Sequence, residues 1–300
     1  MYSILGIGEL LWDMLPEGPQ LGGAPANYTV MAGRLGNKAT VISRIGQDAL
    51  GEQALEVLRP FPVDCSQLQM DAIQQTGKVT VAFENGQPGY TILQPAAWDF
   101  FELTDTWLNA AAQADAVCFG SLAQRSASSR KTIHALVKAT RPDCQRIFDV
   151  NLRSPFYSGE VVRESLALAT VMKMNDAEVP VVLDLLGLPA EGSLREGANL
   201  LLREFDGLSL VAITCGGEGS LLVSHSEWHH HPGVPTRVAD TIGAGDAFTA
   251  AMTTYLLRGA PLPVLNEAGN RWGSFVASQH GAMPAIDAEI LRRVTAEIGG

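Results

Sequence analysis

The sequence has few cysteines and no long run without charge. Its 300 residues include four cysteines, which lie far apart and form no Cys-x-x-Cys pair. We therefore expect reduced thiols, as in a cytoplasmic protein, rather than a disulfide framework or a zinc site. No uncharged run reaches the roughly 18 residues of a membrane helix, which predicts that the chain does not cross a membrane.

Basic residues are also scarce relative to acidic ones. There are 32 aspartates and glutamates against 21 lysines and arginines, so the formal net charge is -11. A protein that binds nucleic acid through a broad basic face has the opposite balance, and we expect no nucleic-acid partner. An anionic substrate is still allowed, because backbone N–H groups bind phosphate in acidic proteins too.

Several well-known motifs are missing. The sequence contains no G-x-x-x-x-G-K-[ST], no H-R-D with D-F-G and no G-x-S-x-G, which excludes a Walker-type phosphate loop, a protein kinase and an α/β-hydrolase. Gly6 and Gly8 lack the third glycine of a dinucleotide fingerprint. Residues 1–8 have no basic region, so they predict a buried strand rather than a signal peptide. We expect an exposed strand or turn at the histidines 229–231, without a metal.

Apolar β-rich runs alternate with helical patterns along most of the chain. Such alternation predicts an α/β fold with a mostly parallel central sheet that helices cover on both faces. There is no low-complexity linker, repeat or charge run, so we expect one main domain over residues 1–300 with a small appendage. The expected strands are residues 3–8, 39–45, 115–119, 146–150, 170–174 and 208–214, and the helices are 53–59, 128–140, 161–169, 175–186 and 194–204.

Two further helices begin after loops of small residues. Residues 27–35 and 246–257 carry apolar side chains at i, i+3, i+4 and i+7, so each predicts a helix with one buried face. The loops that precede them read GGAPA and TIGAG. Small residues before a helix leave its first N–H groups open to a ligand.

One segment interrupts the alternation. Residues 76–93 read as a strand, an Asn85-Gly86 turn and a second strand, which predicts a hairpin with a loop of four or five residues. A hairpin without a covering helix could close over a cleft, pair with another subunit or extend the sheet. We favour a β lid, formed by residues of about 9–23 and 76–99, and the pairing alternative would make a homodimer through the lid.

The strongest chemical signal is the segment Asp240–Asp246, which reads DTIGAGD. The backbone N–H groups of Gly243, Ala244 and Gly245 can converge on one anionic oxygen, aided by the helix dipole. Phosphoryl transfer needs such a group of donors, because the transferred phosphate carries the charge. A carboxylate at residue 246 beside a phosphate site could accept the proton of an attacking hydroxyl group. Taken alone, the aspartate could instead cap the helix and the glycines could only form a tight turn.

Together, several motifs resemble those of the ribokinase-like (PfkB) carbohydrate kinases, in the form found in fructokinases. DTIGAGD is similar to the C-terminal signature of that family, and Gly22–Asn27 (GGAPAN) is similar to its N-terminal signature. The segment 149–153 resembles the family's DxNxR motif, with Val150 where fructokinases usually carry proline. Three more segments resemble family motifs: residues 8–13 the first strand with its sugar-binding aspartate, 35–51 the RLG…GxD…G stretch and 175–178 the NxxE motif.

The resemblance implies a ribokinase-like three-layer sandwich and a set of sugar contacts. Asp13 and Asn27, with the backbone of Gly22 and Gly23, would bind the sugar hydroxyl groups, for which short polar side chains and accessible backbone are suited. Arg153 would meet the transferred phosphate or an anionic group of the substrate. By themselves, Asp13 could be a turn residue, Asn27 a helix N-cap and Arg153 the partner of a nearby aspartate.

The resemblance also implies ATP and Mg²⁺ as cofactors. Asn175 would lie near the phosphates and Glu178 would act on the metal through water, although the same spacing fits an N-cap with its capping-box partner. Thr214, Gly216 and Gly219 match the family's T-x-G-x-x-G nucleotide segment and also fit a turn between two strands. Asp240 and the carbonyl of Ile242 could join a site for a monovalent cation such as K⁺, in which Ala285 offers no hydroxyl group.

These observations predict an ATP-dependent kinase that phosphorylates a primary hydroxyl group of a small sugar, with Asp246 as general base. The GGAPAN form favours fructose. Ribose, 2-keto-3-deoxygluconate and a nucleoside remain alternatives, and Arg153 would suit the carboxylated sugar. A sensor without catalytic activity is a further alternative, but it would be expected to lack Asp246, Gly243 or Gly245, all of which are present.

Overall fold

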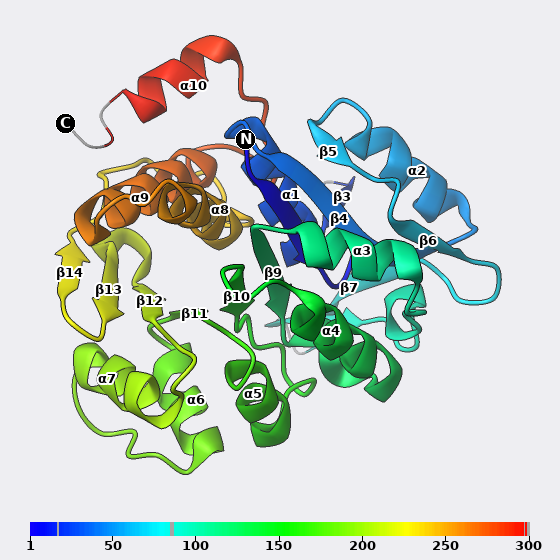
Figure 1. Ribbon diagram of the computed structural model, residues 1–300. Helices are drawn as coiled ribbons and strands as arrows, with labels where there is room; N and C mark the ends of the chain where they lie inside the picture. Colours follow the sequence, from blue (N-terminus) through cyan, green and yellow to red (C-terminus); the bar gives the residue numbers. More distant parts are fainter. Residues whose placement is uncertain (17, 85–86, 297, 299–300) are drawn as a thin grey trace.

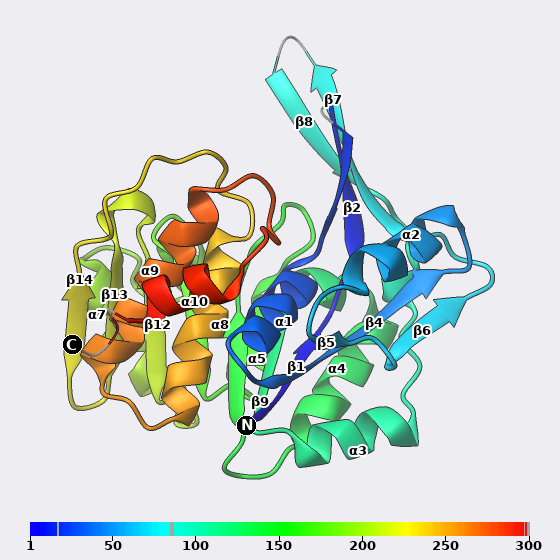
Figure 2. The ribbon, with the colours of Figure 1, turned by 90° about the horizontal axis from the view of Figure 1, so that it is seen from above.

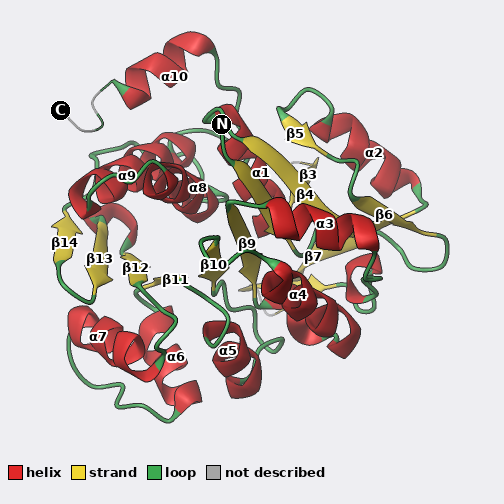
Figure 3. Cartoon of the chain, viewed as in Figure 1, coloured by secondary structure: helices red, strands yellow, loops and turns green. Residues whose placement is uncertain are grey.

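The computed structural model describes residues 1–16, 18–84, 87–296 and 298, and it contains a large and a small β-sheet (Figures 1 and 3). The large sheet lies between two layers of helices, so the predicted α/β fold with its mostly parallel sheet is confirmed. Within these residues, no helix combines the length and the apolar character that crossing a membrane would require.

The large sheet follows the strand order β14-β13-β12-β11-β10-β9-β1-β4-β5, and β6 pairs with β4. The strands from β12 to β5 run parallel, whereas β13 and β14 add antiparallel pairs at one edge. Each of the six expected strands is present with its ends within two residues of the prediction. The strands are β1 (Ser3–Ile7), β4 (Lys38–Gly46), β5 (Val63–Asp64), β6 (Leu68–Asp71), β9 (Ala116–Gly120), β10 (Gln145–Asp149), β11 (Val171–Asn175), β12 (Leu210–Thr214), β13 (Ser220–Ser224) and β14 (Trp228–His231).

Alternate residues of the central strands point to opposite layers. On β1, Ile4 packs in one core cluster and Leu5 in the other, as expected for a strand that is buried on both faces. One layer contains α1 (Ala24–Arg34), α8 (Ala244–Leu257), α9 (Leu262–Ala277) and α10 (Ala288–Thr295). The other contains α3 (Asp105–Gln113), α4 (Ala127–Ala139), α5 (Gly159–Leu166), α6 (Glu178–Leu186) and α7 (Leu194–Glu204), while α2 (Ala49–Leu58) packs beside β4.

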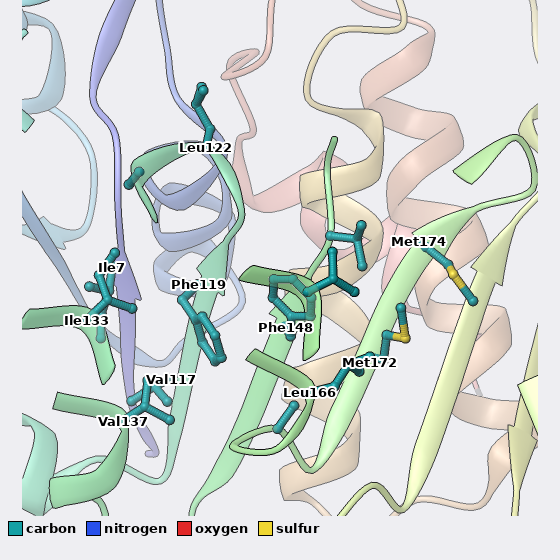
Figure 4. Close-up of a cluster of buried hydrophobic side chains, with 14 of the residues drawn as sticks. Ile7, Val117, Phe119, Leu122, Ile133, Val137, Phe148, Leu166, Met172 and Met174 are labelled. Carbon is teal, nitrogen blue, oxygen red and sulfur yellow. The ribbon is translucent and has the colours of Figure 1, made fainter. Parts of the chain in front are cut away.

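The core beneath α4 and α5 is continuous with the middle of the sheet (Figure 4). Phe119 on β9 stacks on Phe148 on β10 with ring centroids 5.4 Å apart. Ile133 of α4 and Leu166 of α5 cover the same region and are fully buried. Burial of side chains of this size stabilises the fold by about 1.5–3 kcal/mol each, and it holds the carboxyl ends of the parallel strands in fixed positions.

The small sheet projects from the body of the molecule (Figure 2). Its order is β3-β2-β7-β8, with β2 (Leu11–Leu15), β3 (Gly18–Gly22), β7 (Gly77–Glu84) and β8 (Gln87–Ile92). The predicted hairpin is therefore present, but the predicted loop of four or five residues is wrong. Pairing continues to Glu84 and Gln87, so only two residues separate the strands. The Asn85-Gly86 turn signal itself lies outside the described residues.

The sequence analysis missed several elements. It did not predict β2 and β3 as a hairpin, nor α3, α9 and α10. The expected helix over residues 175–186 begins only at Glu178, because Asn175 is the last residue of β11. The histidines 229–231 do lie on a strand, but His231 is buried and its Nε2 is 2.7 Å from Glu267 of α9.

Candidate active site

A cavity of about 1280 Å³ lies at the carboxyl ends of the central strands, between the body and the small sheet. Pockets for a single small ligand usually measure about 300–1,000 Å³, so this cavity is larger than one small molecule requires. The described lining includes Asp13, Gly23 and Asn27 at one end and Thr214, Gly216 and Gly219 at the other. Asp246, Gly243, Ala244, Gly245, Arg153 and Asn175 also line it.

The amino end of α8 forms part of this wall. Gly243 precedes the helix with a φ of 77°, and a Cβ atom there would lie 2.6 Å from the Cβ of Ala282, so only glycine fits. In the described part of the chain, the N–H groups of Gly243 and Gly245 donate to no protein acceptor. The N–H of Ala244 donates to the carbonyl of Thr241 at 3.3 Å. Two of the three predicted phosphate-binding amides are thus free.

Asp246 lies in the first turn of α8 and faces the same cavity as Asp13. Its Oδ2 accepts a hydrogen bond of 2.7 Å from Nδ2 of Asn27, a residue 219 positions away in the sequence. Burial and the nearby carboxylate of Asp149 raise the pKa of Asp246 to about 6, although Asn27, Lys173 and Arg153 partly offset the increase. A carboxylate with this pKa can accept a proton near neutral pH.

Asn27 is not a helix N-cap, because α1 begins at Ala24 and Gly23 is its N-cap. Asn27 is the fourth residue of α1, and its backbone N–H donates to the carbonyl oxygen of Gly23. Its side chain is 6% exposed, and its Oδ1 has no partner among the described residues. The structure therefore leaves one acceptor atom of Asn27 available beside the Asp246 carboxylate.

Lys173 is a buried cation behind Asp246 that the sequence analysis missed. It lies in β11, and its Nζ is 3.2 Å from Oδ1 of Asp149 at the end of β10. Oδ2 of Asp149 accepts a hydrogen bond of 3.0 Å from Oγ1 of Thr249 on α8. Burial alone would lower the pKa of Lys173, but Asp149, Asp246 and Glu178 attract the ammonium group and raise it. Lys173 therefore carries a positive charge at the cavity wall.

Lys173 also lies directly beneath the glycines of α8. A Cβ atom on Gly245 would lie only 2.9 Å from its Nζ. The ammonium group and the amide donors thus converge on one region, where they would stabilise an anion. A signal for Lys173 existed in the sequence, since a lysine within the otherwise apolar run of β11 must find a partner when buried.

The small sheet supplies the other wall of the cavity. Asp13 lies on β2, opposite Gln20 of β3, and burial raises its pKa, with Arg153 acting in the opposite sense. Gly22 does not line the cavity. A Cβ there would lie 2.7 Å from Oδ2 of Asp13, so this glycine leaves space for the carboxyl group.

Arg153 is exposed and reaches the cavity from the loop after β10. Its Nη1 donates to the carbonyl of Leu152 at 3.1 Å, and no ion pair holds it within the described residues. Asn151 of the same loop has a φ of 39°, in the left-handed region that asparagine tolerates better than most residues. Asn151 lines the cavity, and the sequence analysis did not assign it a role.

At the other end, Thr214 closes β12 and a short turn over Gly216–Glu218 leads into β13. Gly216 and Gly219 adopt positive φ values of 54° and 86°. A Cβ on Gly219 would meet the carbonyl oxygen of His231 at 1.9 Å, so the backbone approach requires glycine there. The predicted turn is present, and its residues line the cavity. The sequence analysis missed a wall of small residues on α9, namely Asn270, Gly273, Ser274 and Ala277.

Two predicted metal-site residues lie outside the cavity lining. Glu178 is buried, and its two oxygens accept hydrogen bonds from the N–H groups of Leu152 at 2.7 Å and Asn175 at 2.8 Å. The N–H of Glu178 donates in return to Oδ1 of Asn175 at 2.9 Å. Its neighbours Asn175 and Asp176 do line the cavity. Glu178 thus connects the loop after β10 to the end of β11 through hydrogen bonds. Its part in binding Mg²⁺ stays a prediction.

Asp240 likewise connects two loops. Its Oδ1 accepts from the N–H of Ile242 at 3.0 Å, and its Oδ2 accepts from the N–H of Gly281 at 3.1 Å. Within the described residues, no group of three or more His, Cys, Asp and Glu side chains could hold a metal ion. The monovalent-cation role of Asp240 therefore stays a prediction as well.

A family model described as pfkB family carbohydrate kinase matches residues 19–289. The chain belongs to this family. The matched region contains Asn27, Asp246 and residues 214–219 of the cavity lining, whereas Asp13 precedes it. The protein is thus an ATP-dependent carbohydrate kinase, as the combination of motifs predicted.

Individual relatives are similar to this protein in sequence and structure along nearly the whole chain. An uncharacterized sugar kinase from Pyrococcus horikoshii is 31% identical over 298 residues, which cover 93% of this chain and 91% of that protein. Its structure in complex with ATP has a TM-score of 0.82 and covers 98% of this chain and 99% of the other.

Two further relatives differ in substrate. A fructokinase from Vibrio cholerae O395, with fructose, ADP and a calcium ion bound, is 25% identical with a TM-score of 0.82 and covers 99% of both chains. An aminoimidazole riboside kinase from Salmonella typhimurium is 28% identical over 304 residues, or 95% of this chain and 92% of that protein. The chain is therefore a sugar kinase, and family membership alone leaves the sugar open.

Proposed function

We propose that the protein transfers the γ-phosphoryl group of ATP to a primary hydroxyl group of fructose, with Asp246 as general base. One observation carries the proposal. Asp246 lies in the first turn of α8 beside free backbone N–H groups, and it shares its cavity with Asp13 and Asn27. A base, an anion site and a set of sugar-type hydrogen-bonding groups are thus within one enclosed space.

The proposed reaction is a single displacement. The hydroxyl oxygen of the sugar attacks the γ-phosphorus, its proton passes to the carboxylate of Asp246, and the bond to the bridging oxygen of ADP breaks. The raised pKa of Asp246, about 6, supports this role. The hydrogen bond from Asn27 fixes the carboxylate in one orientation.

Charge on the transferred group would be met by several donors. The amides of Gly243 and Gly245 and the ammonium group of Lys173 converge near the amino end of α8. Arg153 adds a charged group from the loop after β10. Removal of one such donor in an enzyme typically costs about 10²–10³ in rate.

Mg²⁺ would reach the site with the phosphates of ATP. The cavity offers Asn175 and Asp176 at that edge, and no larger group of ligands is present among the described residues. This fits Mg²⁺, which keeps several of its waters and needs few protein carboxylates. When bound, the ion would neutralise phosphate charge. Glu178 would act on it through water, and K⁺ would bind near Asp240.

The small sheet would act as a lid over the sugar. Leu11, Asp13 and Leu15 of β2 line the cavity together with Val79 of β7 and Ile92 of β8. Closing this apolar wall over the sugar would exclude water and limit ATP hydrolysis. The lid's edge strands would also suit pairing with a second subunit, which is the homodimer hypothesis.

A second substrate class has a specific observation in its favour. The aminoimidazole riboside kinase relative covers nearly the same length of the chain as the fructokinases do. A cavity of about 1280 Å³ would also accommodate a riboside beside ATP. The exposed Arg153 keeps 2-keto-3-deoxygluconate as an alternative, and ribose is the smallest of these sugars.

The test is one ATP-consumption assay in which fructose, ribose, 2-keto-3-deoxygluconate and aminoimidazole riboside are compared. The phosphorylated position is then read by NMR. We expect kcat/KM to be highest for fructose, with phosphate on a primary hydroxyl group. Faster turnover of a riboside would transfer the assignment to the second class, and binding of a sugar without turnover would support a sensor.

A further inference from the structure

Glu9 is a buried acid at the sugar end of the cavity to which neither the sequence analysis nor the proposed mechanism gives a role. It follows β1 at the carboxyl edge of the sheet, its side chain is 3% exposed, and it lines the cavity with Asn27 and Asp246. Carboxylates are rarely buried to this degree without a partner.

The carboxyl group of Glu9 is only half satisfied. The backbone N–H groups of Glu9 and Ala24 face it, while its Oε2 has no hydrogen-bond partner among the described residues. Burial raises the pKa of Glu9 to about 7, and Arg153 partly offsets this increase. An unpaired buried oxygen at a cavity wall is unfavourable in the empty protein and becomes favourable when a ligand donates to it.

The backbone around Glu9 fixes this placement. Gly23 has a φ of 108°, and a Cβ there would lie 2.4 Å from the carbonyl oxygen of Glu9. Only glycine therefore lets the start of α1 pack against this residue. Asn27, one turn further along α1, has an unpaired Oδ1 facing the same end of the cavity.

The charge at this end selects the type of ligand. Glu9, Asp13 and Asp246 are three acids that face one cation, Arg153, so a phosphate group is less favoured here than a short distance away, where Lys173 and the free amides of α8 lie. Neutral hydroxyl groups of a sugar can donate to Glu9 and to Asn27 Oδ1 at once.

We propose that Glu9 is a substrate-binding residue whose Oε2 accepts a hydrogen bond from a hydroxyl group of the sugar that is not phosphorylated. This inference rests on the proposed sugar kinase function and adds a contact to it. The competing explanation is structural, since the carboxyl group also faces the amino end of α1 and could serve only to stabilise that helix.

The experiment compares the wild type with Glu9→Gln, using the sugar that the wild type phosphorylates best. Glu191→Gln, an exposed glutamate remote from the cavity lining, is the matched control. We expect Glu9→Gln to raise the KM for the sugar about 5- to 10-fold, because an amide oxygen accepts a weaker hydrogen bond than a carboxylate. The KM for ATP should stay within about twofold, and the melting temperature should not fall.

Deoxy analogues of the sugar identify the contact. One analogue that lacks a single hydroxyl group should lose more affinity in the wild type than in Glu9→Gln, because the variant has only a weaker, neutral hydrogen bond to that group left to lose. If Glu9→Gln does not fold, Glu9→Asp, which keeps the charge but shortens the reach, is measured in the same way. It should also raise the KM for the sugar alone.

Unchanged KM for the sugar in an active Glu9 variant would overturn this inference and leave the proposed function intact. A lower melting temperature with unchanged KM would establish the structural explanation instead. A wild-type protein that phosphorylates no sugar would contradict the proposed function and this contact together.

Discussion

The amino ends of α1 and α8 look alike in the sequence and differ in the structure. Both follow a loop of small residues, and both were expected to leave N–H groups open to a ligand. At α8, Gly243 and Gly245 keep free N–H groups and the ammonium group of Lys173 lies beneath them. At α1, Pro25 has no N–H, and the carboxyl group of Glu9 faces Ala24.

In this protein, the charged side chain behind each helix amino end decides which kind of ligand that end suits. A cation beneath α8 adds to the helix dipole, so that end suits an anion such as a phosphate. A carboxyl group beside α1 cancels the dipole, so that end suits neutral hydroxyl groups. Under the proposed mechanism, the same small-residue pattern would serve the sugar end and the phosphate end of one reaction.

Among the variants that test this comparison, the largest effect is expected from removal of the charge behind α8. The double variant Lys173→Met with Asp149→Asn replaces the buried ion pair by neutral groups, so that neither partner is left as an uncompensated charge. We expect kcat to fall about 100-fold because one stabilising charge is lost at the phosphate. The KM for the sugar should change little. Steady-state kinetics with an unfolding curve measure both, and an unaltered kcat would contradict the comparison.

Replacing a glycine by alanine should destabilise the protein at the amino end of α1 but not at the amino end of α8. In Gly23→Ala, the positive φ and the contact with the Glu9 carbonyl oxygen should lower the free energy of unfolding by about 1–3 kcal/mol or more. Gly245→Ala lies inside α8, where alanine is favoured, so stability should hold while the displaced ammonium group lowers kcat about tenfold. Thermal unfolding and kcat of both variants check this. Equal destabilisation by the two alanines would refute it.

The smallest effect is a shift in the pH profile. Asp246 works as a base only when ionised, so kcat/KM should fall as the pH drops through about 6, rather than near the ordinary aspartate value. The charged groups that face it are Asp149, Lys173, Arg153 and, more weakly, Glu9.

Asn27→Ala removes the N–H donor that lowers the pKa of Asp246, so the acid limb should move to higher pH. Measurement of kcat/KM from pH about 5 to 8 in the wild type and this variant tests the assignment. An acid limb that stays in place, or moves to lower pH, would argue that another group controls it.

Local patterns predicted most of the fold. The expected helix over residues 194–204 matches α7 at both ends, because Ser193 and Glu196 form a capping box that marks its start. The hairpin of β2 and β3 in the small sheet was missed because a five-residue strand with Gly18 and Pro19 carries little β-pattern. The helix α9 was missed since its polar Asn266 and Asn270 point into the core, where Ser220 and each other satisfy them.

The site was predicted where one motif carries the chemistry and missed where the contact is tertiary. Asp246, Asn27 and Asp13 share one cavity, as the resemblance to the PfkB kinases implied. The partners of Lys173 and Glu9 lie on other elements, so the apolar run of β11 can signal that Lys173 needs a partner but cannot show which group it meets. The spacing of the NxxE motif did fit the reciprocal hydrogen bonds between Asn175 and Glu178, but it does not show that the second carboxylate oxygen of Glu178 binds the N–H of Leu152.

The central claim is that Asp246 is the base for phosphoryl transfer to a sugar, and Asp246→Asn tests it most directly. Calorimetry should show that the variant still binds ATP and the sugar that the wild type uses. Turnover should fall by about 10²–10⁴ at every pH, because an amide cannot accept the hydroxyl proton. Turnover within a few-fold of the wild type would contradict the account.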